Sequence, residues 1–104
     1  MRNIKTNTKD SNIANSVKSV CKYIEKFDFE KDFDDFCDSV LSVETIKSND
    51  EVIGYEVLLT YGGPTIWYDS RKGRVFGSWW SDYFNADPEE TRKFDEMLFE
   101  TFYE

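Results

Sequence analysis

The sequence has no histidine, only two cysteines and two prolines, and no long hydrophobic run. Without histidine, Ser-His-Asp and Cys-His catalytic arrangements are excluded, and so is the usual general base near neutral pH. A mechanism with paired carboxylates needs no histidine, but no acidic residue stands out in the sequence from a solvated face. We therefore expect a protein that is not an enzyme and needs no cofactor.

Export, membrane and metal signals are equally scarce. The N-terminus lacks the apolar segment of a secretory signal peptide, and no run approaches the roughly 20 apolar residues of a membrane span. Cys21 and Cys37 have no metal-ligand spacing, and we expect them to be reduced thiols in the core of an intracellular protein.

Acidic residues alternate in the segment 28–34 as they do in a calcium-binding loop, but the glycine of the sharp turn is missing and the aromatic residues follow a helical period. We interpret this segment as a helix, not as a metal site. Likewise, Gly62-Gly63-Pro64 is no phosphate-binding loop, because it lacks a lysine at the required offset and leads into a strand.

Acidic residues dominate what is present. The net charge is −8, with 21 acidic and 13 basic residues, so direct nucleic-acid binding is not expected. The charge is also unevenly distributed: the chain after Lys26 carries 19 acidic and seven basic residues, a net charge of −12. One interpretation is solubility, and the other is an acidic surface that meets a basic partner.

Residues 1–9 have no apolar period and are predicted to form a flexible tail, followed by a single α+β domain over residues 10–104. The first helix, from about residue 10 to 26, has an apolar face and a ridge of three lysines (Lys18, Lys22, Lys26). The second, within residues 30–42, has one apolar face (Phe33, Phe36, Cys37, Val40, Leu41) and acids on the outside (Glu30, Asp34, Asp35, Asp38).

The period then changes to two, which predicts strands at residues 51–61, 64–69 and 74–80, with a further short strand at 42–47 before a turn at 48–50. A last helix is expected to start at Asp87-Pro88, with Asp87 and Glu90 as a capping box. The order is ααββββα: an antiparallel meander of three or four strands with the helices packed on one face. The predicted core contains Phe33, Phe36, Val57, Leu59, Phe94 and Leu98.

Two surfaces are candidates for binding. Like charges three or four residues apart on a helix repel, and in the second helix only Lys31 is near enough to offset them. The last helix instead has favourable pairs, Glu89 with Lys93 and Arg92 with Glu96. We therefore predict a partner-binding surface at Glu30, Asp34, Asp35 and Asp38. The tryptophans form the other candidate surface. Side chains alternate along a strand, so Trp79 and Trp80 are expected on opposite faces of the sheet. One of them then belongs to the core, and the other is either covered by a helix or exposed as an interface anchor. Trp67 and Trp80 complete the set of predicted contact residues.

The residues Thr60-Tyr61-Gly62-Gly63-Pro64, followed by Gly77-Ser78-Trp79, form a T-x-GGP…G-x-W pattern. In residues 51–82 the chain resembles small proteins of bacteriophages and mobile elements of Gram-positive bacteria. The resemblance implies a setting in the cytoplasm of a bacterial host, where small acidic proteins act as anti-CRISPR or anti-restriction inhibitors.

Such an inhibitor mimics a nucleic acid and occupies the basic surface of a Cas effector or restriction enzyme. The alternative is a non-catalytic interaction or regulatory module of the mobile element. The basic ridge of the first helix would also allow a homodimer, by docking on the acidic surface of a second copy.

Overall fold

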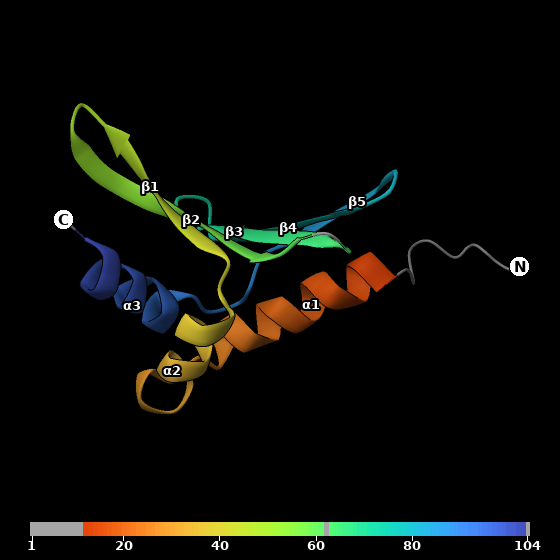
Figure 1. The fold of residues 1–104 in the computed structure, drawn as a ribbon, viewed down its shortest axis with the longest axis horizontal. Helices are drawn as coiled ribbons and strands as arrows, with labels where there is room; N and C mark the ends of the chain where they lie inside the picture. The colour runs from red at the N-terminus through yellow and green to blue at the C-terminus, as the bar shows by residue number, and fades with distance from the viewer. Residues whose placement is uncertain (1–11, 62, 104) are drawn as a thin grey trace, which may run out of the picture.

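The computed structural model describes residues 12–61 and 63–103, so the tail predicted for residues 1–9 lies outside the described part of the chain. Within it, three helices and five strands follow one another as Figure 1 shows. They are α1 (Asn12–Glu25), α2 (Phe29–Ser39), β1 (Ser42–Ser48), β2 (Glu51–Thr60), β3 (Thr65–Asp69), β4 (Arg74–Trp79), β5 (Asp82–Ala86) and α3 (Arg92–Phe102).

The strands form one sheet in the order β1-β2-β3-β4-β5, and each strand is antiparallel to the next. The predicted α+β class and antiparallel meander are confirmed, but the sheet has five strands and not three or four. The missed strand is β5, which pairs only with β4 and has no fully buried residue. The strand has only five residues, and two of them, Asp82 and Asn85, are of types that are depleted in strands, so its sequence gives little strand signal.

The helices lie on one face of the sheet (Figure 1). Helix α1 contacts β4 and β5, and α3 packs on β2 through Phe99, whose ring meets that of Tyr55 edge-on at 5.1 Å. Helix α2 lies farther from the sheet, where it contacts α3. In the described part of the chain, the outer side of α2 and the opposite face of the sheet are therefore without a covering element.

The core is largely aromatic where the three helices meet. The Phe94 ring contacts those of Phe27, Phe36 and Tyr68 edge-on, at centroid distances of 5.2, 5.5 and 5.4 Å. Such pairs contribute about 0.5–1.5 kcal/mol each beyond the area that they bury. Of the six predicted core residues, four are buried (Phe36, Val57, Leu98 and Phe94), while Phe33 and Leu59 are partly buried against them.

Helix α2 begins as its sequence suggests but covers less of the core than expected. Asp28 is the N-cap, and its carboxylate accepts hydrogen bonds from the backbone N–H groups of Glu30 and Lys31 at 2.9 and 3.3 Å. The helix ends at Ser39. Cys37 and Leu41 are exposed, so the prediction that they belong to the buried face was wrong. Only the side facing α3 is covered, and Leu41 already lies in the extended segment that leads into β1.

The capping box predicted for the last helix was also wrong. Helix α3 begins at Arg92, and its N-cap, Thr91, makes no capping hydrogen bond through its side chain. The Asp87 carboxylate instead pairs with Arg74 of β4, and the Glu90 carboxylate accepts a hydrogen bond from the backbone N–H of Arg92 at 2.9 Å. The ion pair to a neighbouring strand holds Asp87 before the helix, so the helix starts about a turn later than its sequence suggests.

Among the described residues, no helix is both long enough and apolar enough to cross a bilayer.

Candidate functional site

The outer side of α2 carries four exposed carboxylates, Glu30, Asp34, Asp35 and Asp38, which we call the acidic surface of α2. None of them forms an ion pair with another described residue. No basic residue stands in the last turn of α2, where a cation would complement the helix dipole. Asp35 and Asp38 thus repel each other near the negative end of the helix, and neither forms an ion pair in the described part of the chain.

The other two acids of this segment have a local role in folding. The backbone N–H of Asp28 donates to the Asp32 carboxylate at 2.9 Å, while the Asp28 side chain caps the first turn. These reciprocal bonds satisfy backbone groups that the start of a helix leaves unpaired. The acidic surface of α2 therefore excludes Asp28 and Asp32, whose charges also suit the positive end of the helix.

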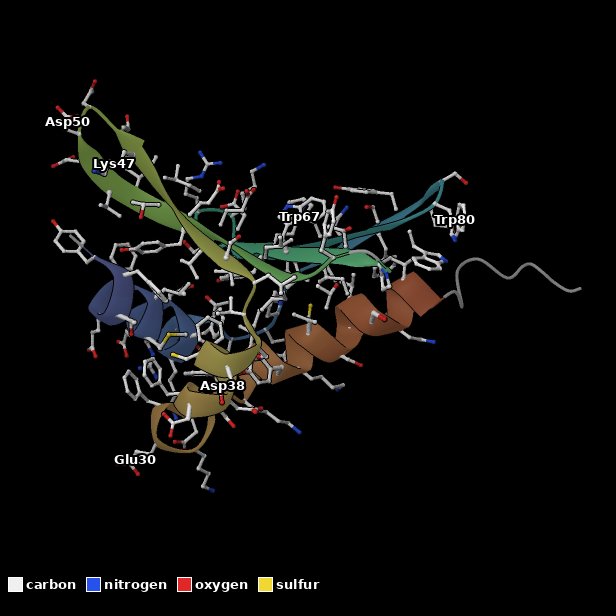
Figure 2. All side chains as sticks on the ribbon, viewed as in Figure 1. Glu30, Asp38, Lys47, Asp50, Trp67 and Trp80 are labelled. Carbon is white, nitrogen blue, oxygen red and sulfur yellow. The ribbon has the colours of Figure 1, made fainter. Side chains whose placement is uncertain are left out.

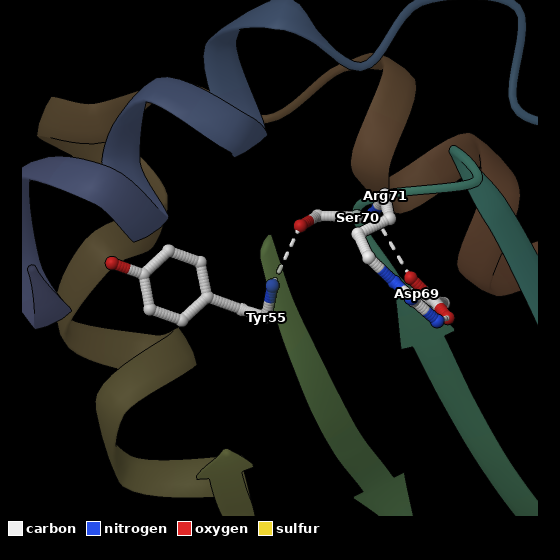
Figure 3. A network of polar contacts seen from close by, with 4 residues as sticks. All are labelled: Tyr55, Asp69, Ser70 and Arg71. Atoms are coloured by element: carbon white, nitrogen blue, oxygen red, sulfur yellow. Dashed lines mark hydrogen bonds and ion pairs between the residues drawn. The ribbon is translucent and has the colours of Figure 1, made fainter. Parts of the chain in front are cut away.

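Three acids outside α2 form ion pairs with arginine in the described part of the chain: Asp69, Asp87 and Glu96. Asp69, only 5% exposed, accepts hydrogen bonds from the Arg71 backbone N–H at 2.9 Å and from its guanidinium at 3.2 Å (Figure 3). In the same loop, the Ser70 hydroxyl oxygen accepts the backbone N–H of Tyr55 at 2.8 Å. Arg74 pairs with Asp87 at 2.7 Å, and the predicted Arg92–Glu96 pair is present at 3.9 Å. Glu89 and Lys93, predicted to pair, form no ion pair in the described part of the chain, because Glu89 precedes the helix.

Trp67 lies on the open face of the sheet, by which we mean the face opposite the helices (Figure 2). Its ring stacks on that of Phe76 from β4 at a centroid distance of 5.5 Å and an interplanar angle of 12°. On the far side of the pair, the Lys72 Nζ lies over the Phe76 ring at 5.5 Å. Trp67 is half-buried by its strand neighbours alone, and no helix covers it.

Trp80 is 87% exposed in the turn between β4 and β5, and its φ is +57°. Trp79 is partly buried against the core, so one tryptophan of the pair belongs to the core and the other is exposed. In two-residue hairpin turns, positive φ is a position for glycine or asparagine, and a bulky side chain there is strained. A large apolar ring held in solvent by a strained backbone is the kind of outlier that points to a contact with a partner.

The predicted contact residues do not form one site. The four carboxylates are exposed on α2. Trp67 lies across the sheet from Glu30 and Asp38, and Trp80 stands at the end of the β4–β5 hairpin (Figure 2). Sequence reasoning missed two further acids, Glu44 and Glu56, which face each other across β1 and β2 beside Trp67. Alternation places both on the open face, but only the strand register brings them together.

The basic ridge of α1 is exposed at Lys18, Lys22 and Lys26. Lys18 also lies over the Phe84 ring, with its Nζ 5.7 Å from the centroid. Lys18 and Lys22 line a hollow that also contains Glu25, Asp87 and Glu89. The ridge thus has acidic residues beside it, and the homodimer stays a prediction.

Burial perturbs the pKa of several ionisable groups, including Asp95 and Cys21. The Tyr68 hydroxyl donates to Asp95 Oδ1 at 2.7 Å, and the Thr91 hydroxyl donates to Asp95 Oδ2 at 2.9 Å. Burial raises the pKa of Asp95, although both donors favour its ionised form. Burial, with Glu25 and Asp87 nearby, raises the pKa of the Cys21 thiol to about 11, which makes it a poor nucleophile at neutral pH. Among the described residues, no group of three or more Cys, Asp or Glu side chains could hold a metal ion.

The T-x-GGP…G-x-W pattern has a structural explanation. The Thr60 hydroxyl donates to the Pro64 carbonyl at 2.7 Å and closes the loop between β2 and β3. A Cβ atom on Gly63 would lie 3.7 Å from the Trp79 ring, so the loop packs beside the end of β4. The pattern joins two adjacent hairpins, so its residues have a role in building the sheet.

Comparisons of the chain with protein-family models, curated proteins and solved structures found no match.

Proposed function

We propose that this protein is a non-catalytic inhibitor that binds the basic surface of a nucleic-acid-handling protein through the acidic surface of α2. One observation carries the proposal: Glu30, Asp34, Asp35 and Asp38 are exposed on one side of one helix, without an ion pair among the described residues. Other described acids, such as Glu44 and Glu56, also form no ion pair, but on α2 four such acids lie together on one side of a helix.

The physical basis is competition with a polyanion. Nucleic-acid grooves are lined by Lys and Arg, and a ligand that neutralises them gains from the release of bound ions. The carboxylates of α2 repel one another in the free protein, at a cost of a few tenths of a kcal/mol per pair, and a basic partner removes that repulsion. A rigid acidic helix can therefore occupy such a groove without being a nucleic acid.

The resemblance of residues 51–82 to proteins of phages and mobile elements supports a bacterial defence effector, of the CRISPR-Cas or restriction type, as the partner. The alternative is a non-inhibitory interaction module of the same elements. Trp80 favours that alternative, because an exposed and strained tryptophan would anchor a protein contact that does not depend on charge. The two functions differ in whether binding displaces nucleic acid from the partner.

The first experiment is capture of partners from the lysate of a bacterium with CRISPR-Cas and restriction systems, at about 50 mM salt, followed by identification by mass spectrometry. A captured effector is then tested for displacement of its DNA or RNA by the purified protein. We expect displacement, and we expect the affinity to fall steeply between about 50 and 200 mM salt. If the protein binds the effector and leaves its nucleic-acid binding unchanged, the interaction-module alternative is correct.

The second experiment reverses Asp34, Asp35 and Asp38 to Lys and should abolish binding. The matched control reverses Glu51, Glu89 and Glu100 to Lys, which are exposed acids outside α2 that form no ion pair with another described residue. Each reversal adds two charges, so both variants have a net charge of −2 instead of −8. We expect the control to bind nearly as tightly as the wild type, with circular dichroism confirming the fold of both. Equal loss in the two variants would mean that net charge, and not the acidic surface of α2, drives binding.

A further inference from the structure

The open face of the sheet carries two neighbouring rows of side chains that run across the strands. In the first row, Glu44 of β1 is paired in register with Glu56 of β2, Glu56 with Asp69 of β3, and Asp69 with Arg74 of β4. The second row runs beside it, with its members in register in the same way (Ser42, Leu58, Trp67, Phe76). One row is charged and the other is largely apolar, so the face has the two components of a binding site for an amphipathic cation.

The charged row is neutralised at only one end. Asp69 has Arg71 as its partner, and Arg74 has Asp87. Glu44 and Glu56 are exposed, directly opposite each other, and form no ion pair with another residue in 12–61 or 63–103. Like charges directly opposite each other across a strand pair destabilise a sheet. A cation supplied from outside would remove that repulsion.

A hollow of about 340 Å³ lies at this end of the two rows, and its lining consists of Ser42, Glu44, Glu56, Leu58 and Trp67. It thus combines the two unneutralised carboxylates with an aromatic ring and an aliphatic side chain. At the other end of the aromatic pair, the fold already places a cation over a ring, because Lys72 lies over Phe76. At the end of the row where the hollow lies, Trp67 offers an aromatic ring as Phe76 does, and the carboxylates of Glu44 and Glu56 stand beside it.

We propose that this hollow binds an arginine side chain of a partner protein. The guanidinium is flat and presents donors in a fork, so it can pair with Glu44 and Glu56 while its plane or its aliphatic stem rests on Trp67 and Leu58. Lysine has a compact, strongly hydrated charge that cannot form the same bidentate contacts. A nucleic acid could stack its bases on Trp67, but the two carboxylates would repel its phosphates.

This site goes beyond the proposed function, because it lies on the other side of the molecule from the acidic surface of α2 (Figure 2). A partner could contact either surface alone. The variants that test one surface leave the other intact, so failure of one proposal is distinguishable from failure of the other.

The experiment is an NMR titration of the ¹⁵N-labelled full chain with three short peptides: Ac-Gly-Arg-Gly-NH₂, the same peptide with lysine, and the same peptide with citrulline. Citrulline keeps the shape of arginine and lacks its charge. We expect the arginine peptide to shift the Trp67 indole signal and the amides of β1 and β2, with lysine weaker and citrulline near the limit of detection. Equal binding of arginine and citrulline, or of arginine and lysine, would overturn the proposal.

The variant Glu44→Gln/Glu56→Gln removes both charges and should weaken arginine binding about tenfold or more, because hydrogen bonds to charged groups are the strong ones. It should fold at least as stably as the wild type, since the opposed charges are gone. The matched control, Asp34→Asn/Asp35→Asn, removes two charges from α2 and should leave arginine binding unchanged. If the control variant weakens arginine binding as much as the Glu44/Glu56 variant does, long-range charge and not the hollow drives binding, and the proposal is wrong. If oligo(dT) shifts the Trp67 indole signal more than the arginine peptide does, the open face is a nucleic-acid site instead.

Discussion

Val17 of α1 lies directly against Gly77 of β4. A Cβ atom on residue 77 would stand 2.5 Å from Val17 Cγ2 and 2.7 Å from Ile13 Cδ1, and real Cβ atoms essentially never show contacts under 3.0 Å. Helix α1 therefore approaches the sheet closely because residue 77 has no side chain. The glycine of the G-x-W pattern, Gly77, thus sets the distance between the helix and the sheet.

The variant Gly77→Ala should consequently be destabilised. Overpacking a well-filled core costs about 1–3 kcal/mol, and here the opposing atoms belong to two buried side chains. Gly63→Ala is the control, because the nearest atom to its added Cβ is 3.7 Å away, and its stability should change by less than about 0.5 kcal/mol. Urea denaturation of the three proteins measures both effects. Equal stability of Gly77→Ala and the wild type would mean that α1 does not pack as described.

The adjacent tryptophans should respond in opposite ways to the same substitution. Trp80→Asn places a residue that tolerates positive φ at the strained position, where a bulky residue costs about 1–2 kcal/mol. It gives up an edge contact with Trp79, with centroids 5.8 Å apart, worth about 0.5–1.5 kcal/mol. We expect stability to be unchanged or higher. Trp79→Asn should lose about 2 kcal/mol or more, because Trp79 packs against the core.

Thermal denaturation of the two variants tests this contrast. If Trp80→Asn is as destabilised as Trp79→Asn, Trp80 has a role in folding and is not a free contact residue. A stable Trp80→Asn variant is also the correct reagent for asking whether the exposed ring contributes to partner binding.

The two cysteines should differ in reactivity. Cys37 is exposed, whereas Cys21 is 6% exposed and has a pKa raised to about 11. Because the thiolate is the reactive species, a raised pKa lowers its concentration at pH 8 and burial blocks access. Titration with a thiol reagent at pH 8 should find one reactive thiol per folded chain and two in guanidinium chloride. Cys37→Ser should leave none in the folded protein, and rapid reaction of that variant would contradict the packing of α1.

The raised pKa of Asp95 leads us to predict how the stability of the protein depends on pH. Its pKa is raised in the folded protein, chiefly by burial, so the folded state binds the proton more tightly than the unfolded state. Its contribution to stability is fully present below the unfolded pKa, which is about 3.9, and is lost as the pH rises through the folded pKa. Relative to Asp95→Asn, the wild type should therefore gain stability as the pH is lowered toward 4.

The measurement is the free energy of unfolding of wild type and Asp95→Asn from about pH 3 to pH 8. Taking the difference removes the effect of the other carboxylates, which titrate in both proteins. Tyr68→Phe is a useful companion, because it removes the 2.7 Å hydrogen bond and keeps the aromatic packing. A difference that does not change with pH would show that Asp95 titrates alike in the folded and unfolded states.

The sequence by itself determined the features that depend on neighbouring residues. A helical period needs only a few turns of chain, so the existence of α1 and α2 followed from spacing alone, although α2 ends earlier than predicted. The outward direction of its acids followed in the same way (Glu30, Asp34, Asp35, Asp38). The β1–β2 hairpin followed in the same way from the period of two and the turn residues Asn49-Asp50. In the structure these two residues have positive φ, +52° and +68°, as a tight hairpin turn requires. The buried positions Phe36, Val57, Phe94 and Leu98 were predictable for this reason.

Only the tertiary structure decided the features that depend on residues distant in the chain. Arg74 holds Asp87 out of the helix that local capping signals predicted, and the edge strand β5 is defined by pairing with β4 rather than by its own pattern. The register that sets Glu44 opposite Glu56, beside Trp67, joins three strands and leaves no trace in any one of them. Periodicity tells which face of a strand a side chain occupies, but the neighbour across the sheet is set by the packing of the whole domain.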